Sequence, residues 1–508
     1  MAEIILIRPK YTEIMSHLKE SRPPAGLLYV AATLVQHNFD VVIIDQSVEK
    51  EWENRLIAEL NEKTIFVGIT CLTGYMILNG IEIVKIVRRH SQCPVVWGGV
   101  HPYLEPDSTI ASEYVDIIVV GEGEETAVEL ASVLKFGGEL KDIEGIIYKK
   151  DGKIIKNKYR ALYNLNELPE LPLHLVNWEL YRNHSMLYEF FNFRNPLAIS
   201  IETSRGCTHR CRYCVEANET HIKTGNSSWR YMKAEKIVDI IEYAINRYGI
   251  KSFTVIDDNF FVHIERVKKF CDELERRGLA IEWFAEIRTD TITKRMDIPF
   301  LERLQRNGLR SIGVGIESGS DKILKYLNKG ETVETYIEAN RMLAHTHIRV
   351  QYGLILGLPY EKKEDVVKSY KLVIQLLREN SYAAPKLNKL LPTPNTPIMN
   401  DCIKLGFKKP SRFEEWYSYC DTNWFNGPGV WMDKETTEFI MSQLHFQYVL
   451  SVYKQKRSLF WRMLYRCSSA LLLFRIERDF YSLRFEKKLI DVIRNPLVMG
   501  FLRRVLNM

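Results

Sequence analysis

The first part of the chain alternates between short apolar runs and amphipathic segments, and this rhythm limits its fold more than any other feature. Apolar runs of four to six residues are typical of strands that are buried on both faces of a parallel sheet. The amphipathic stretches between them are typical of helices that cover such a sheet. The alternation therefore predicts a doubly wound α/β domain over residues 1–150. The expected strands are 4–7, 41–45, 65–70, 94–98 and 116–120.

The same rhythm resumes further along the chain, over residues 197–400. About six β-α units in roughly 200 residues are typical of a complete or partial TIM-type β/α barrel. Residues 151–196 are expected to form a linker, because the prolines of Leu168-Pro-Glu-Leu-Pro172 disfavour regular structure. Residues 401–508 are expected to form a helical region rich in basic and aromatic side chains. The expected strands are 197–202, 252–256, 281–286, 311–316, 350–356 and 386–391.

Composition excludes several classes of protein. With 46% hydrophobic and 26% charged residues, the 508-residue chain has enough apolar surface to fold. No apolar run approaches 18 residues, and the N-terminus is typical of a first strand rather than a signal peptide, so we expect a cytoplasmic protein. Residues 454–508 carry a net charge of +9, which leaves −3 for the rest of a chain of net charge +6. The protein as a whole is therefore not expected to bind nucleic acid.

The basic tail allows two interpretations. Its arginines alternate with Phe, Trp and Leu, and such side chains can cover a core while their charged ends reach water. They can also bind an anionic membrane surface, where each basic residue contributes about 1 kcal/mol. The sequence therefore predicts either docking on the barrel or peripheral membrane contact.

Three of the nine cysteines lie together in a C-x3-C-x2-C pattern after the first strand of the second unit. These are Cys207, Cys211 and Cys214, and we name residues 207–214 the cysteine loop. Three thiolates so close in sequence can surround a soft metal centre. A structural zinc site would need a fourth ligand, for which His209 is a candidate. An iron–sulfur cube held by three cysteines would leave one iron open for a substrate or cofactor.

The cysteine loop, with Tyr213 before its last cysteine, resembles the signature of radical S-adenosylmethionine (SAM) enzymes. The resemblance implies a [4Fe-4S] cluster on Cys207, Cys211 and Cys214, with SAM bound at the open iron. It also implies that one-electron reduction, by a donor such as flavodoxin or ferredoxin, cleaves SAM to methionine and a 5′-deoxyadenosyl radical.

Later segments resemble the same family in the order in which they occur. Asp257-Asp258 follows the second strand of the unit, and Glu286-Ile-Arg288 follows the third, where a guanidinium suits the SAM carboxylate. Two positions depart from the family pattern: Asp257-Asp258 replaces Gly-Gly-Glu, and Asn395 stands where many relatives have glycine. The SAM-binding residues implied by the resemblance are Tyr213, Asp257, Asp258, Glu286, Arg288, Glu317 and Pro359.

The first domain resembles that of the cobalamin-binding branch of radical SAM enzymes, through the segments 23–32, 98–101 and 121–124. The resemblance implies a cobalamin between the two domains. None of the twelve histidines has an aspartate two residues before it, so the Asp-x-His-x-x-Gly motif is absent and cobalt is expected without a histidine ligand from that motif. The candidate cobalamin-binding residues are Cys71, Leu72, Thr73, Gly98, Gly99, His101, Gly121, Glu122, Gly123 and Glu124.

Together these resemblances imply a cobalamin-dependent radical SAM enzyme. The first hypothesis is a C-methyltransferase acting on an unactivated carbon of a hydrophobic (lipid, isoprenoid or pigment-like) or secondary-metabolite small molecule. The second is an oxidative cyclase or rearrangement enzyme with the same cofactors, and the third is a cobalamin-binding sensor with a structural metal loop. A methylthiotransferase is disfavoured, because the two N-terminal cysteines, Cys71 and Cys93, do not form a second cluster motif.

Overall fold

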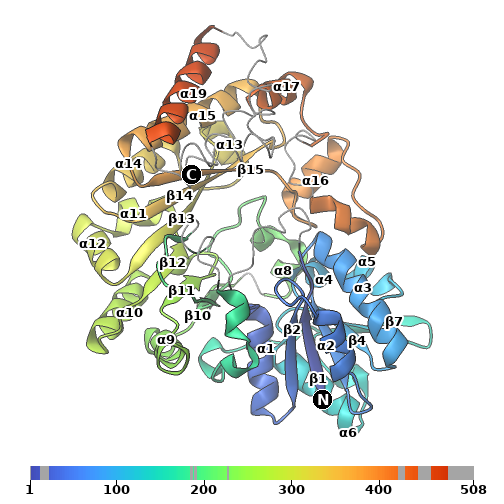
Figure 1. Cartoon of the computed structure of the whole chain (residues 1–508). Coiled ribbons are helices and arrows are strands. Elements are labelled where there is room, and N and C mark those ends of the chain that lie inside the picture. Colours follow the sequence, from blue (N-terminus) through green and yellow to red (C-terminus); the bar gives the residue numbers. More distant parts are fainter. Residues whose placement is uncertain are drawn as a thin grey trace.

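Figure 1 shows two units, each built around a sheet, with the first in blue and the second in green to orange. This computed structural model describes residues 2–11, 22–182, 187, 191–225, 228–420, 429–443 and 459–478. The first sheet has the order β2-β1-β3-β4-β5-β6-β7, and its first five strands are parallel. They are β1 (Ile4–Arg8), β2 (Val41–Asp45), β3 (Phe66–Thr70), β4 (Val95–Gly98) and β5 (Ile117–Val119).

Helices cover both faces of the first sheet, which confirms the predicted doubly wound architecture. Ile4 and Leu6 of β1 pack on the face of α1 and α6, whereas Ile5 and Ile7 pack on the face of α3. A strand buried on both sides needs a continuous apolar run, and this is why the sequence revealed all five parallel strands. The helices are α1 (Ala25–Gln36), α2 (Trp52–Glu59), α3 (Tyr75–His90), α4 (Val100–Leu104), α5 (Pro106–Ala111) and α6 (Glu124–Phe136).

A hairpin of β6 (Ile146–Lys150) and β7 (Lys153–Lys156) extends this sheet beyond residue 150, where we expected the first domain to end. The two residues of its turn, Asp151 and Gly152, both have positive φ, as a type I′ turn requires. The Asp-Gly pair was the sequence signal for this hairpin. We missed it because β7 is largely exposed and has no apolar run of its own.

The second sheet contains six parallel strands, each beside the next one along the chain. This order, with helical crossovers between successive strands, confirms the predicted partial barrel. The strands are β8 (Ala198–Ile201), β11 (Ser252–Val255), β12 (Glu282–Glu286), β13 (Leu309–Glu317), β14 (Arg349–Leu356) and β15 (Ala383–Lys389). The helices are α8 (Glu219–Lys223), α9 (Ala234–Tyr248), α10 (Ile264–Arg276), α11 (Thr289–Arg295), α12 (Ile298–Arg306), α13 (Asp321–Tyr326), α14 (Val333–Leu343) and α15 (Lys363–Glu379).

The segment after the second sheet returns to the first domain. Following α16 (Pro397–Lys404), the 3-10 helix η8 (Phe413–Cys420) packs against α3. Its Phe413 and Trp416 are fully buried in the core on that face of the first sheet. We expected residues 401–508 to form a region of their own, but this part of them ties the two sheets together.

The helices α17 (Lys434–Ser442) and α19 (Leu459–Arg478) pack on α15, and Leu472 of α19 joins the main core. Most of the basic tail lies outside the described residues, so its docking on the barrel or on a membrane stays a prediction. Among the helices that the structure describes, none is long and apolar enough to cross a membrane.

Candidate active site at the junction of the two sheets

A cavity of about 430 Å³ lies where the first domain meets the cysteine loop. Its apolar wall is the α1 and α6 face of the first sheet, with side chains such as Leu6, Phe66 and Val96. Its other wall comes from the second unit and contains Glu202, Arg205, Gly206, Val215, Glu216, His221 and Asp258. An apolar cavity with a few polar groups on one side is the usual form of a small-molecule or cofactor site.

Glycines form the edge of this cavity. Gly98 and Gly99 follow β4, and the 121–124 turn follows β5, so they meet at the carboxyl edge of the parallel sheet. Gly99 has φ +88°, and a Cβ there would lie 2.8 Å from Thr70 Oγ1. The candidate residues Gly98, Gly99, Gly121, Glu122, Gly123 and Glu124 therefore line one cavity.

The remaining candidates of the first domain lie elsewhere. Cys71 is buried, Leu72 is exposed, and neither they nor Thr73 and His101 belong to the cavity lining. His101 Nδ1 lies 2.9 Å from Thr73 Oγ1, and the ring packs against Phe413 and Trp416. Complete burial, with a smaller effect from Lys409, lowers the pKa of His101 to about 3 and keeps the ring neutral. Its Nε2 has no hydrogen-bond partner among the described residues.

The cysteine loop begins beside the cavity. The short antiparallel strands β9 (Ser204–Arg205) and β10 (Arg230–Tyr231) precede and follow it, and Gly206 turns the chain with φ +78°. Cys211 is buried, and Cys207 and Cys214 are partly buried. Burial raises the pKa of all three thiols, so a bound cation would be needed to hold them as thiolates.

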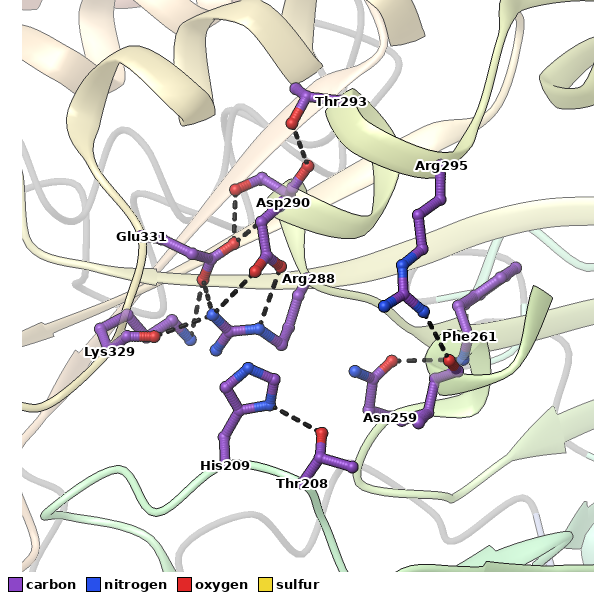
Figure 2. A network of polar contacts seen from close by, with 12 residues as sticks. Thr208, His209, Asn259, Phe261, Arg288, Asp290, Thr293, Arg295, Lys329 and Glu331 are labelled. Carbon is purple, nitrogen blue, oxygen red and sulfur yellow. Dashed lines mark hydrogen bonds and ion pairs between the residues drawn. The ribbon is translucent and has the colours of Figure 1, made fainter.

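His209 is the candidate fourth ligand of a zinc site. Its Nδ1 lies 3.1 Å from Thr208 Oγ1, and its ring lies beside Arg288 (Figure 2). A structural zinc ion needs four donors that converge on one point, whereas three cysteines can hold an iron–sulfur cube and leave one iron open. With His209 placed in this way, the three cysteines fit a cube better than a zinc loop.

Tyr213 and Glu317, both predicted from the sequence, are in direct contact. The Tyr213 hydroxyl donates to Glu317 Oε1 over 2.7 Å. Lys329 Nζ lies 3.3 Å from the same oxygen and 3.4 Å from the Tyr213 hydroxyl. Lys329 is almost fully buried and brings a positive charge into the barrel. We did not predict it, because it lies after α13 rather than after a strand.

Glycines on β13 make room for these carboxylates. A Cβ at Gly315 would lie 2.2 Å from Glu317 Oε1, and a Cβ at Gly313 would lie 2.1 Å from Glu286 Oε2. The two glycines of the Gly-Val-Gly-Ile-Glu sequence thus leave space on β13 for two carboxylates, Glu286 of β12 and Glu317 of β13. Both acids lie at the carboxyl ends of their strands, the end at which the cysteine loop leaves β8.

Asp257 and Asp258 are adjacent in sequence but differ in surroundings. Asp257 is buried and accepts hydrogen bonds from the Thr203 amide and hydroxyl, both 2.6 Å, and from the Ser204 hydroxyl, 2.5 Å. It therefore anchors the chain just before the cysteine loop. Asp258 faces the cavity, where reduced hydration and then the Glu216 carboxylate raise its pKa above the usual range.

Arg288 lies in the network drawn in Figure 2. Its Nε donates to Asp290 over 3.1 Å, and its Nη2 donates to the Lys329 carbonyl over 2.8 Å and lies 3.5 Å from Glu331. It remains a candidate for the SAM carboxylate, although three groups of the protein already hold it.

Pro359 lies in a buried loop after β14, and a residue that we did not predict holds this loop. Glu361 Oε2 accepts the amides of Gly357 and Leu358 over 2.8 and 3.2 Å. The Trp431 indole donates to the Gly357 carbonyl over 2.7 Å. The loop is therefore fixed both from within and by the C-terminal segment.

Arg205 was also missed by sequence reasoning. It lies two residues before Cys207 and pairs with Glu202, over 2.7 Å, and with both acids of the 121–124 turn, over 2.8 and 2.5 Å. Arg230 pairs with Glu122 as well. The two acids predicted to contact cobalamin are thus bound to the second unit by arginines.

Comparison with known families agrees with this division of the chain. Residues 12–131 match the B12 binding domain, and residues 201–373 match the radical SAM superfamily. An uncharacterized methyltransferase of Pyrococcus horikoshii is 29% identical over 74% of this chain and 78% of its own length. An anaerobic magnesium-protoporphyrin IX monomethyl ester cyclase of Synechocystis sp. is 26% identical over 73% of this chain and 72% of its own length.

Solved structures share the fold over most of the chain. The cobalamin-dependent SAM radical enzyme OxsB, solved with aqua-cobalamin and SAM, gives a TM-score of 0.69 at 20% identity over 97% of this chain and 75% of its own. The radical SAM methyltransferase TsrM of Kitasatospora setae gives 0.62 at 18% identity over 82% of this chain and 81% of its own. With a B12 binding domain and a radical SAM domain in one fold, the chain belongs to the cobalamin-binding radical SAM enzymes.

Proposed function

We propose that this protein is a radical SAM C-methyltransferase, with cobalamin in the cavity and SAM at a [4Fe-4S] cluster on Cys207, Cys211 and Cys214. One observation carries the proposal: Gly206, Val215 and Glu216, which flank the cysteines, line the same cavity as the glycines of the B12 binding domain. The two cofactor sites therefore share a wall, as a methyl relay between them requires.

The residues present suit both groups. The cavity offers an apolar sheet face with a glycine edge, open to a flat ring system and to the backbone of a ligand. The barrel offers a buried cation, Lys329, a guanidinium, Arg288, and the carboxylates of Glu286 and Glu317, which match the carboxylate, amino and hydroxyl groups of SAM. When bound, the cluster and SAM supply a 5′-deoxyadenosyl radical, and cobalamin supplies a methyl group.

The protein's own residues hold and orient these groups. Tyr213, Glu317 and Lys329 form one group at the end of β13, and Glu361 holds the loop after the neighbouring strand β14. The apolar lining of the cavity disfavours water, which helps to protect a reactive radical from side reactions. A reduced donor such as flavodoxin or ferredoxin would supply the electron.

The substrate that we propose is a hydrophobic or secondary-metabolite small molecule. Relatives named as methyltransferases support methyl transfer, and a relative named bacteriochlorophyllide d C-12(1)-methyltransferase, 25% identical, is named for a pigment substrate. Relatives named as pigment ester cyclases favour a second candidate, an oxidative cyclisation that starts from the same radical.

Product analysis separates these functions. The reconstituted enzyme, with hydroxocobalamin, SAM and a reductant, is expected to form both 5′-deoxyadenosine and S-adenosylhomocysteine. Formation of 5′-deoxyadenosine without S-adenosylhomocysteine would favour cyclisation. The absence of both products would contradict an enzymatic role. A Cys211→Ala variant, carried through the same preparation, should form no 5′-deoxyadenosine.

A further inference from the structure

The junction between the first domain and the cysteine loop contains a charged contact that none of the cofactor roles above explains. Arg205 receives carboxylates from two units: Glu202 at the end of β8, and Glu122 and Glu124 from the turn after β5. Its side chain is only 14% exposed. Ion pairs so shielded from water are costly to break from one side, because the remaining charges stay buried without a partner.

The three partners approach Arg205 with well-defined geometry. The distances are 2.7 Å from Nε to Glu202 Oε2, 2.8 Å from Nη1 to Glu122 Oε1 and 2.5 Å from Nη2 to Glu124 Oε1. Each carboxylate thus binds a different nitrogen of the guanidinium. Such a fork is possible for arginine and not for lysine, whose donors share one atom.

Further bonds make both ends of this contact stiff. The Tyr29 hydroxyl, from α1 of the first domain, donates to the Glu202 carbonyl over 3.0 Å and accepts the Glu202 amide over 2.8 Å. Glu122 also accepts the Tyr163 amide over 2.6 Å. Only Gly206 separates Arg205 from Cys207, so a displacement of Arg205 would reach the cysteine loop within one residue.

We propose that Arg205 is a positioning residue that couples the cavity of the first domain to the cysteine loop, so that a ligand bound against the 121–124 turn changes the affinity of the cluster site for its own ligand. The 121–124 turn lines the cavity, and Arg205 and Gly206 line it from the other side. Because the contact is stiff, a ligand that displaces this turn would displace Arg205 and the start of the cysteine loop with it. This inference rests on the proposed function for the identity of the two ligands, hydroxocobalamin and SAM.

Coupling between two sites is reciprocal, and this gives a test that does not depend on activity. The dissociation constant of hydroxocobalamin is measured with and without SAM, and that of SAM with and without hydroxocobalamin, on the reconstituted full chain. We define the coupling factor as the ratio of a ligand's dissociation constants without and with the other ligand. For the wild-type protein we expect the same coupling factor from the hydroxocobalamin measurements and from the SAM measurements, within the usual range of about 5- to 150-fold.

Three variants and one control decide the role of Arg205. Arg205→Gln and Glu124→Gln, placed on opposite sides of the junction, should both reduce the factor to about one, and Arg205→Lys should not restore it. Arg277→Gln is the control: Arg277 also pairs with three carboxylates and is also 14% exposed, but all its partners lie on α9 and α10 of one unit. It should leave the factor unchanged.

The possible failures are distinct. An unchanged factor in Glu124→Gln would overturn the inference even if Arg205→Gln failed to take up iron. Independent binding of both ligands by the wild-type protein would overturn it while leaving the proposed function intact. Failure of the wild-type protein to bind either ligand would instead contradict the proposed function.

Discussion

The two sheets of this protein carry their sites in different ways. In the first, the predicted ligand-binding positions that line the apolar cavity are mostly glycines, and the two acids among them, Glu122 and Glu124, are held by arginines of the second unit. In the second, charged side chains gather at the strand ends, and glycines make room for them. The first site is therefore defined by shape and the second by charge, and substitutions at matched positions should have different consequences.

The largest effect is expected from removing the donors of the charged site. Alanine at Cys207, Cys211 or Cys214 should reduce bound iron from about four atoms per chain to nearly none, because three thiolates are needed to hold the cube. Iron analysis after anaerobic reconstitution measures this. Cys467→Ser, at an exposed position of α19, should leave the iron content unchanged. If one of the three alanine variants kept all of its iron, the cluster would have to be bound by other residues of the chain.

A glycine of the second sheet tests whether room for a carboxylate matters there. Gly313→Ala would place a Cβ 2.1 Å from Glu286 Oε2 and displace that carboxylate, so SAM affinity should fall by about tenfold, or about 1.4 kcal/mol. Gly353→Ala on the neighbouring β14 meets no atom nearer than 3.8 Å and should change the affinity by less than about twofold. Equal losses in the two variants would contradict a role for Glu286.

A pair of glycines in the first domain separates backbone strain from shape. Gly99 and Gly137 have φ of +88° and +89°, so alanine at either should cost about 1–3 kcal/mol of stability. Only at Gly99 would the Cβ also meet neighbours, at 2.8 Å from Thr70 Oγ1, whereas nothing lies within 4 Å at Gly137. Hydroxocobalamin affinity should therefore fall in Gly99→Ala alone. A similar loss in Gly137→Ala would mean that general destabilisation explains both.

The last prediction concerns pH and the loop that Glu361 holds. Burial raises the pKa of Glu361 from 4.5 to about 8, although the Gly357 and Leu358 amides oppose this. Between these values the folded chain keeps a proton that the unfolded chain has lost, so this group's contribution to stability falls as pH rises, by at most about 1.4 kcal/mol per pH unit. Glu361→Gln should lose less stability than the wild type between about pH 5 and pH 8. If the thermal unfolding midpoints of the wild type and Glu361→Gln change in parallel between pH 5 and pH 8, this prediction is wrong.

The fold could be predicted wherever burial leaves an apolar pattern. All five parallel strands of the first sheet and the six of the second lie within a few residues of the expected runs. The hairpin at residues 146–156 could not be found in this way, because β7 is largely exposed. Nor could the return of Phe413 and Trp416 to the first domain, since aromatic residues in a loop do not indicate which core they will enter.

The candidate site could be predicted only in part, for a related reason. Motif order identified the cysteines and the acids after the strands, since the topology itself brings strand ends together. Arg205, Lys329 and Glu361 act through partners that are distant in sequence or through backbone amides, and a single sequence gives no signal for such pairings. In the same way, no spacing rule could show that Glu122 and Glu124 bind an arginine of the other unit.

Our proposed function requires that one chain hold both a cluster and a cobalamin at the junction of its two sheets. The metal content of the full chain, purified without oxygen from cells supplied with cobalamin, provides the decisive test. We expect about four iron atoms and about one cobalt per chain. Iron without cobalt would exclude the methyl relay and make the first domain a binding module for another molecule, and zinc in place of iron would contradict the radical chemistry altogether.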